Sequence, residues 1–165
     1  MRDPFHNPFS PDDPARHAIW EMLVPRDIDA FLAADWTVVA GDFIEDGFYG
    51  ISGNHQADPG QWTLAFPTLA AYRAEWLRQA EDFAAKRYAE DPRIAIFNTT
   101  TLEEIDVKGD AALARKRFKG GIRRADGAFD SMEWQTLYSC RLHQGRWKLS
   151  GFTGYLPYSM GSIST

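Results

Sequence analysis

The sequence has little cysteine, few histidines and no long apolar run, and each shortage excludes a class of protein. Cys140 is the only cysteine, so neither an internal disulfide nor a thiolate metal cluster can form. The four histidines are scattered, and no two candidate ligands have the spacing of a metal site, so we expect no metal and no cofactor. No apolar stretch is long enough to span a membrane, and the start, "MRDPFHNPFSPDDPARHA", lacks the apolar centre of a signal peptide. We therefore expect a cytoplasmic protein that does not bind membranes.

An excess of positive charge is also missing. The formal net charge is −5, which argues against a nucleic-acid partner, because phosphates need a basic surface. The one basic run, "ARKRFKGGIRR", spans residues 114–124. We expect it to form a solvated outer face on which Glu104 pairs with Arg115. The alternative is a patch for RNA or for acidic partners, the latter bound through Arg115, Arg117, Lys119 and Arg123.

The residues that are abundant indicate one globular domain. Hydrophobic residues make up 44% of the 165 positions and aromatic residues 14%, which is enough to bury a core. Prolines at positions 4, 8, 11 and 14 predict an extended arm over residues 1–13. We expect the domain to span residues 14–157 and a flexible tail to span residues 158–165.

The order of local patterns indicates an α+β fold. Helical spacing starts near Pro14, is broken or kinked by Pro25, resumes after it, and is clearest over residues 68–88. A short strand is expected over residues 46–52 and a loop over residues 53–67. Four strands follow, separated by Gly109-Asp110, Asp126-Gly127 and Gln144-Gly145; they are expected over residues 93–107, 111–124, 129–143 and 146–157. Helices followed by antiparallel strands predict helices packed on one face of a sheet.

A two-residue turn at Gln144-Gly145 sets the register of the last two strands. Because side chains alternate along a strand, nearly all the large side chains then lie on one face. We take this face as the inner one. Leu137 would lie opposite Phe152 on the outer face. The inner residues are Leu142, Cys140, Tyr138, Thr136 and Trp134, opposite Trp147, Leu149, Gly151, Thr153 and Tyr155.

The inner face of the preceding strand would include one charged residue, Lys116. A three-residue connection at Asp126-Gly127 brings the apolar phase of that strand inward and sets Lys116 opposite Tyr138. A tighter turn would instead point Arg115, Arg117 and Lys119 inward, and it would expose Phe118 and Ile122.

A two-residue turn at Gly109-Asp110 would pair Lys116 with Glu103, with Thr101 nearby on the same face. Burying a lysine and a glutamate is costly unless the two charges are paired and hydrogen-bonded. An inward Lys–Glu pair would therefore mark a functional site. The alternative is an exposed cross-strand pair beyond the helices, which contributes under ~1 kcal/mol.

Two stretches resemble a known superfamily. They are "AADWTVVAGDFIEDGFYGI", residues 33–51, and "GRWKLSGFTGYLP", residues 145–157. Together with the order of elements, they resemble the nuclear-transport-factor-2-like superfamily, which includes SnoaL-like polyketide cyclases, ketosteroid isomerase and scytalone dehydratase. The resemblance implies a curved antiparallel sheet wrapped on three N-terminal helices, forming a cone with an internal apolar pocket, and a homodimer through the outer face of the sheet. Where ketosteroid isomerase has its catalytic Asp this chain has "GISGN", with His55 just beyond.

These observations predict a pocket for a small apolar or aromatic molecule that carries a carbonyl or carboxylate. Lys116 and Glu103 would be its polar anchors. As an enzyme, the protein would transfer a proton next to a carbonyl, like an isomerase or lyase, with Glu103 or His55 as the base and Tyr138 as hydrogen-bond donor. The alternative is a non-catalytic dimeric association module, in which Leu137 and Phe152 pair two sheets. The expected ligand-binding residues are Lys116, Trp134, Thr101, Trp62, Phe48 and Tyr155.

Overall fold

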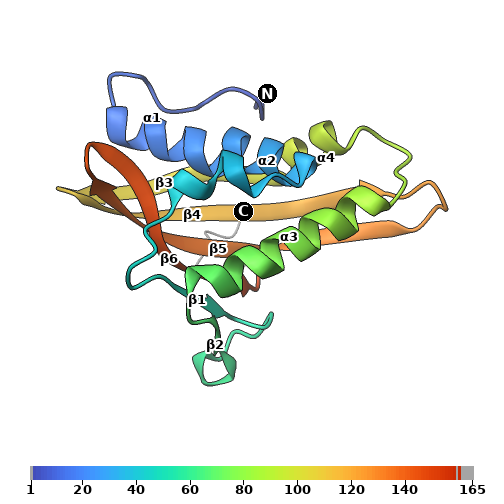
Figure 1. The fold of residues 1–165 in the computed structure, drawn as a ribbon. Coiled ribbons are helices and arrows are strands. Elements are labelled where there is room, and N and C mark those ends of the chain that lie inside the picture. Colours follow the sequence, from blue (N-terminus) through green and yellow to red (C-terminus); the bar gives the residue numbers. More distant parts are fainter. Residues whose placement is uncertain (1, 159, 161–165) are drawn as a thin grey trace.

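Helices and strands form separate layers in the computed structural model, which describes residues 2–158 and residue 160. The helices cover one face of a curved sheet (Figure 1). They are α1 (Pro14–Glu21), α2 (Asp27–Ala33), α3 (Leu69–Ala85) and α4 (Pro92–Thr99). The predicted α+β class is therefore correct.

The helix α4 replaces the beginning of a predicted strand. Residues 93–99 were expected to be extended, but Asp91 accepts hydrogen bonds from the backbone N–H groups of Arg93 and Ile94, at 2.9 and 3.2 Å. Pro92 occupies the first helical position, where its missing N–H costs nothing. The Asp-Pro pair is thus a helix start, and the expectation of a strand from Arg93 is wrong.

Pro25 does not end the first helix but converts it into a π-helical turn. This turn, Met22–Arg26, joins α1 to α2. Pro25 has no N–H to donate to the preceding turn. The N–H of Asp27 then donates to Val24 O instead of the Leu23 O that a continuous α-helix would use. This irregularity fixes the direction of Asp27.

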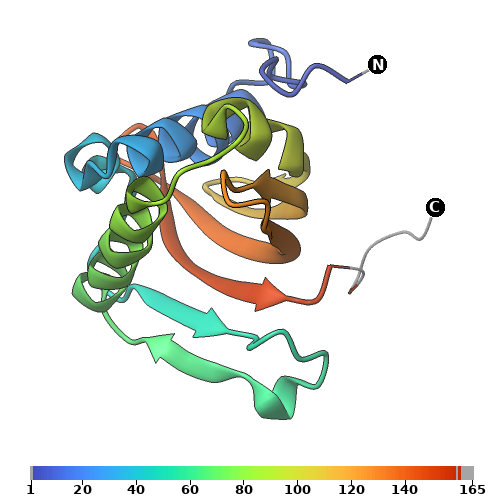
Figure 2. The same ribbon diagram turned by 90° about the vertical axis from the view of Figure 1, so that its right-hand side faces the viewer.

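The sheet has six strands in the order β2-β1-β6-β5-β4-β3. Neighbouring strands are antiparallel, except for the parallel pair β1 and β6. Figure 2 shows the curvature of the sheet, with the helices on one side of it. β2 lies within residues 53–67, which were expected to be a loop. The strands are β1 (Tyr49–Ser52), β2 (Thr63–Phe66), β3 (Thr100–Lys108), β4 (Ala111–Arg123), β5 (Phe129–His143) and β6 (Arg146–Leu156).

The last hairpin follows the predicted register only near its turn. Cys140 lies opposite Leu149 as expected, but an irregularity next to Cys140 shifts the following pairs. Tyr138 therefore faces Phe152 rather than Gly151. Phe152 points into the core and is 5% exposed, so its predicted place on the outer face is wrong.

The hairpin of β3 and β4 is shifted in the same way. Ile105 lies opposite Ala114 as the two-residue turn predicts, but a bulge then places Leu102 opposite Lys116. Glu103 is the bulged residue and is exposed, so the predicted Lys116–Glu103 pair does not form. Because of the bulge, the charged side chain of Glu103 does not lie on the inner face.

Lys116 nevertheless faces inward, as predicted. The N–H of Arg124 donates to Ala128 O at 2.8 Å, which leaves a three-residue connection. Its residues are 125–127, one position earlier than expected, so Lys116 lies opposite Thr136 rather than Tyr138.

The N-terminal arm packs on the domain. Phe5 stacks on Phe97 of α4, with ring centroids 4.6 Å apart, and Arg2 Nη1 donates to Thr100 O at 2.7 Å. Most of the predicted flexible tail, residues 159 and 161–165, lies outside the described residues.

Candidate functional site

A cavity of about 330 Å³ lies between the helices α2 and α3 and the inner face of β4, β5 and β6. This volume is within the range of small-molecule sites. Its inner part is lined by Asp27, Tyr72, Trp76, Lys116, Thr136, Tyr138 and Phe152, and its walls by Ile28, Phe31, Gln79, Phe83, Ile96, Phe118, Ile122, Met132, Trp134, Gly154 and Tyr155.

The inner end of the cavity holds an ion pair between a buried lysine and a partly buried aspartate. Lys116 is 1% exposed, and its Nζ donates to Asp27 Oδ2 at 3.2 Å and to the Leu23 carbonyl oxygen. The π-helical turn makes this geometry possible, because it places the Leu23 carbonyl and the Asp27 carboxylate where the same ammonium reaches both. Such turns are frequent at functional sites.

Two aromatic contacts hold the pair in place. Trp76 Nε1 donates to Asp27 Oδ1 at 3.4 Å, so each carboxylate oxygen has a donor. Lys116 Nζ also lies 5.2 Å from the centroid of the Phe118 ring, a favourable cation–π distance. Lysine and aspartate together carry no net charge.

Tyrosine hydroxyls add neutral hydrogen-bonding groups to the cavity. Burial raises the pKa of Tyr138 well above its ordinary value, and the nearby negative charge of Asp27 raises it further. Burial is also the main cause of the raised pKa of Tyr72. Tyr155 accepts a hydrogen bond from Gln79 Nε2 at 2.9 Å, and burial raises its pKa too. All three hydroxyls therefore stay protonated and able to donate near neutral pH.

Aromatic rings form the wall of the cavity on the sheet side. Trp134 lies against Phe118 at 4.9 Å and near Tyr155 at 6.0 Å between centroids. At the mouth the lining side chains are charged. They form ion pairs of Asp82 with Lys86 and of Asp130 with Arg124, each at 3.3 Å.

Four of the predicted site residues meet at this cavity. They are Lys116, Trp134, Tyr138 and Tyr155. Lys116, Trp134 and Tyr138 come from β4 and β5, where the turn signals predict the inward face, and Tyr155 comes from the irregular end of β6.

The other predicted site residues lie elsewhere. Glu103 and Thr101 are turned away from the main cavity by the bulge in β3, and Glu103 lines a smaller cavity of about 140 Å³ beneath the N-terminal arm. His55 is exposed in the β1–β2 connection, where Trp62 Nε1 donates to Gln56 O at 2.8 Å. Phe48 belongs to the core behind the cavity and contacts Tyr72 at 5.8 Å between centroids.

Sequence reasoning missed Asp27, Tyr72 and Gln79. Asp27 follows Pro25 closely and has the position of an ordinary helix-start carboxylate. Tyr72 and Gln79 lie in the helix predicted over residues 68–88, whose spacing does not show which of its side chains reach the pocket. The signal that could have found Asp27 is the buried Lys116, which requires a carboxylate partner.

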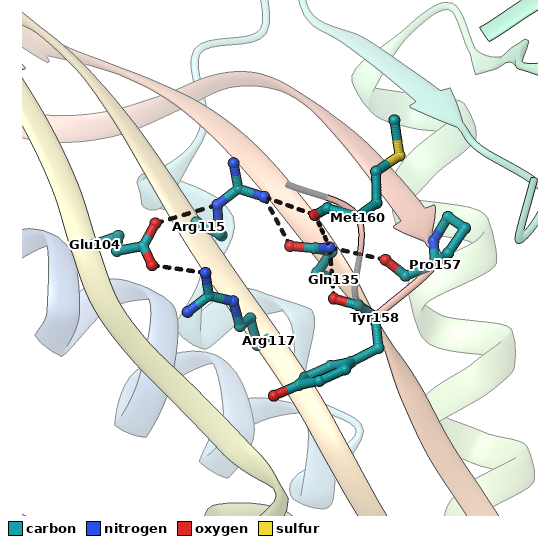
Figure 3. Close-up of polar contacts among 7 residues, drawn as sticks. All are labelled: Glu104, Arg115, Arg117, Gln135, Pro157, Tyr158 and Met160. Atoms are coloured by element: carbon teal, nitrogen blue, oxygen red, sulfur yellow. Dashed lines mark hydrogen bonds and ion pairs between the residues drawn. The ribbon is translucent and has the colours of Figure 1, made fainter. Parts of the chain in front are cut away.

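The outer face of the sheet carries a separate polar network (Figure 3). Glu104 pairs with Arg115 at 3.3 Å, as predicted, and with Arg117 at 2.6 Å. Gln135 is fully buried because the chain after β6 folds back over it. Its Nε2 donates to the carbonyl oxygens of Pro157 and Tyr158, both at 2.7 Å, and to that of Met160.

The described residues contain no group of three or more side chains that could hold a metal ion. Among the same residues, no helix is both long and apolar enough to cross a membrane.

Comparison with family models gives no match, and comparison with curated protein sequences gives none either. Solved structures do match. A nuclear-transport-factor-2-like protein of unknown function from Pseudomonas putida is 16% identical, with a TM-score of 0.58 over 86% of each chain. A conserved protein from Planctomyces limnophilus is 18% identical, with a TM-score of 0.56 over 87% of this chain and 95% of its own. A nuclear-transport-factor-2-like protein with a cystatin-like fold from Novosphingobium aromaticivorans has a TM-score of 0.53 at 16% identity, over 89% of this chain and 84% of its own.

A curved sheet that closes with helices around an aromatic cavity defines the class of α+β cone proteins. This chain has the nuclear-transport-factor-2-like, or cystatin-like, form of that fold, as the resemblance predicted. At these identities the likeness concerns the fold alone, and the activity has to be argued from the cavity.

Proposed function

We propose that this chain is a small-molecule-binding protein of the SnoaL-like kind, whose cavity holds a mainly apolar, ring-bearing ligand. The observation that carries the proposal is the buried ammonium group of Lys116 at the inner end of a largely aromatic cavity. An ammonium group has three N–H donors, of which Asp27 and the Leu23 carbonyl take two. We propose that the third donates to a carbonyl or carboxylate oxygen of the ligand, and that the Tyr138 hydroxyl is a second donor.

The reaction that these groups support best is proton transfer next to a carbonyl. In this reaction a C–H bond of the ligand breaks, its proton moves to the Asp27 carboxylate, and the electron pair moves to the carbonyl oxygen. Lys116 and Tyr138 would stabilise the enolate oxygen, and Asp27 would return the proton to the same or another carbon. Asp27 takes the role of base that the sequence assigned to Glu103 or His55, because neither of those side chains lines the cavity.

Thermal unfolding with a panel of aromatic and alicyclic ketones and carboxylic acids tests the binding step. A ligand at about 100 times its Kd adds about 2.7 kcal/mol, and each kcal/mol raises Tm by about 2–4 °C for a chain of this size. We expect the shift to disappear in Lys116→Met and to shrink in Tyr138→Phe. The controls Lys108→Met and Tyr49→Phe alter residues away from the cavity and should keep it. A panel without any shift would contradict the proposal.

Deuterium exchange tests the chemical step. Ketones that bind should exchange their α-hydrogens in D2O faster with the native protein than with Asp27→Asn, as followed by mass spectrometry. Equal exchange rates would show that the protein binds the ketone but does not catalyse this reaction.

The alternative association module loses part of its basis, because Phe152 is buried and Leu137 alone remains of the expected outer pair. The homodimer through the outer face stays a prediction, and the mass of the protein measured by light scattering decides it.

A further inference from the structure

We infer that the ligand of the main cavity is a neutral carbonyl compound on a ring system, such as a ketone, ester or lactone. The cavity would then discriminate against carboxylates and amines of the same shape. The inference rests on the proposed function, because it takes this cavity as the binding site, and it narrows the ligand to one chemical class.

The charges at the inner end of the cavity already cancel. Lys116 contributes one positive charge and Asp27 one negative charge, held 3.2 Å apart. The remaining polar groups there, Tyr72, Thr136 and Tyr138, are neutral, and the raised pKa values of both tyrosines keep them so.

The charged groups at the mouth do not alter this balance. Asp82 pairs with Lys86, and Asp130 pairs with Arg124. In each of these pairs the opposite charges lie 3.3 Å apart, and the four side chains are 33–60% exposed to water. A ligand that enters the cavity therefore meets no net charge along its path.

A charged ligand would be destabilised in this setting. A carboxylate would lose its hydration and would have to share Lys116 with Asp27, so that two anions repel each other across one cation. A protonated amine would likewise lose its hydration and would have to share Asp27 with Lys116, so that two cations repel each other across one anion. A carbonyl oxygen accepts hydrogen bonds from Lys116 and Tyr138 without adding charge, so only the neutral ligand uses the donors at little desolvation cost.

The walls determine the rest of the ligand. Phe118 and Trp134 lie on the sheet side, and Phe31, Trp76 and Phe83 lie on the helix side. Rings on opposite sides favour a flat or gently puckered ring system between them, because stacked and edge-to-face contacts add to the burial of area.

A matched pair of probes tests the inference directly. 2-Acetylnaphthalene and 2-naphthoate have the same ring and differ only in a methyl group against an anionic oxygen. Titration that follows tryptophan fluorescence should show the ketone binding to the native protein at least tenfold more tightly than the naphthoate. Equal or tighter binding of the naphthoate would overturn the inference while leaving the proposed function intact.

Removing the negative charge should reverse the preference. In Asp27→Asn the charge of the Lys116 ammonium group is no longer neutralised, so the affinity for naphthoate should rise at least tenfold relative to the affinity for the ketone. Asp82→Asn removes the same charge at the exposed mouth and should change the ratio less than twofold. An unchanged ratio in Asp27→Asn would refute the charge argument.

Different results would contradict the inference and the proposed function. If neither probe binds to the native protein or to Asp27→Asn, or if binding survives both Lys116→Met and Trp134→Ala, the cavity is not the binding site and the proposed function falls with the inference. Should Asp27→Asn not fold, the native protein still decides, because the ratio of ketone to naphthoate binding needs no variant.

Discussion

Replacement of Lys116 by methionine should destabilise the protein, although methionine is apolar and similar in length. The change leaves the Leu23 carbonyl without its charged donor, which costs about 1–3 kcal/mol. It also leaves Asp27 without its counter-charge, and breaking a fully buried pair costs about 3–5 kcal/mol. The Asp27 side chain is 31% exposed, so this second cost is reduced, and we expect a total of about 2–4 kcal/mol.

A double-mutant cycle separates the ion pair from the packing. Lys116→Met, Asp27→Asn and the double variant are compared by urea unfolding at pH 7. Because the double variant contains no uncompensated charge, we expect it to recover at least ~1.5 kcal/mol relative to the sum of the single changes. Lys108→Met, at an exposed site on β3, should remain within about 0.5 kcal/mol of the native protein. Additive effects within about 0.5 kcal/mol would refute the view that the two charges act as a pair.

Three further predictions concern stability. The pKa of Tyr138 is raised in the native state above its unfolded value, so its contribution to the free energy of unfolding is complete below about pH 10 and is lost as the pH rises further. Urea midpoints measured between pH 8 and 11 should therefore fall less steeply in Tyr138→Phe than in the native protein. Asp42 is 1% exposed and pairs with both Arg26 and Arg146, so Asp42→Asn should cost about 3 kcal/mol or more in chemical denaturation, and a cost below about 1 kcal/mol would contradict the bridging role. Gln135→Ala should speed amide hydrogen exchange at the end of β6 and lower stability by about 1–2 kcal/mol, whereas unchanged exchange would show that this side chain does not hold the segment.

The sequence predicts the sheet best where a turn is short and strongly marked. Near Gln144-Gly145 and Gly109-Asp110 the pairs lie as expected, because the turn alone sets the register. Farther along the strands, bulges shift the pairing, and no local pattern marks them. Glu103 shows the consequence, since its predicted inward direction depends on an unbroken alternation that the bulge interrupts.

The candidate site is predictable where it comes from the strands and not where it comes from the helices. Lys116, Trp134 and Tyr138 follow from one inner face, whereas Tyr155 lines the cavity where β6 is irregular, with a positive φ of 54° at Tyr155 itself. Asp27 depends on a π-helical turn, and helical periodicity in the sequence assumes 3.6 residues per turn throughout. His55 and Trp62 precede β2 in a connection whose path no periodic pattern specifies, so placing them at the pocket had no physical basis in the sequence.

The π-helical turn makes the chain intolerant to a change of length at one point. Each residue of an α-helix advances the helix by about 100° of rotation, so deleting one residue from Met22–Arg26 would turn α2 by roughly that angle relative to α1. Asp27 and Phe31 would then leave the cavity together, although no residue that lines it had been replaced. Relatives that share this cavity chemistry should therefore conserve the number of residues in this segment more strictly than their identity.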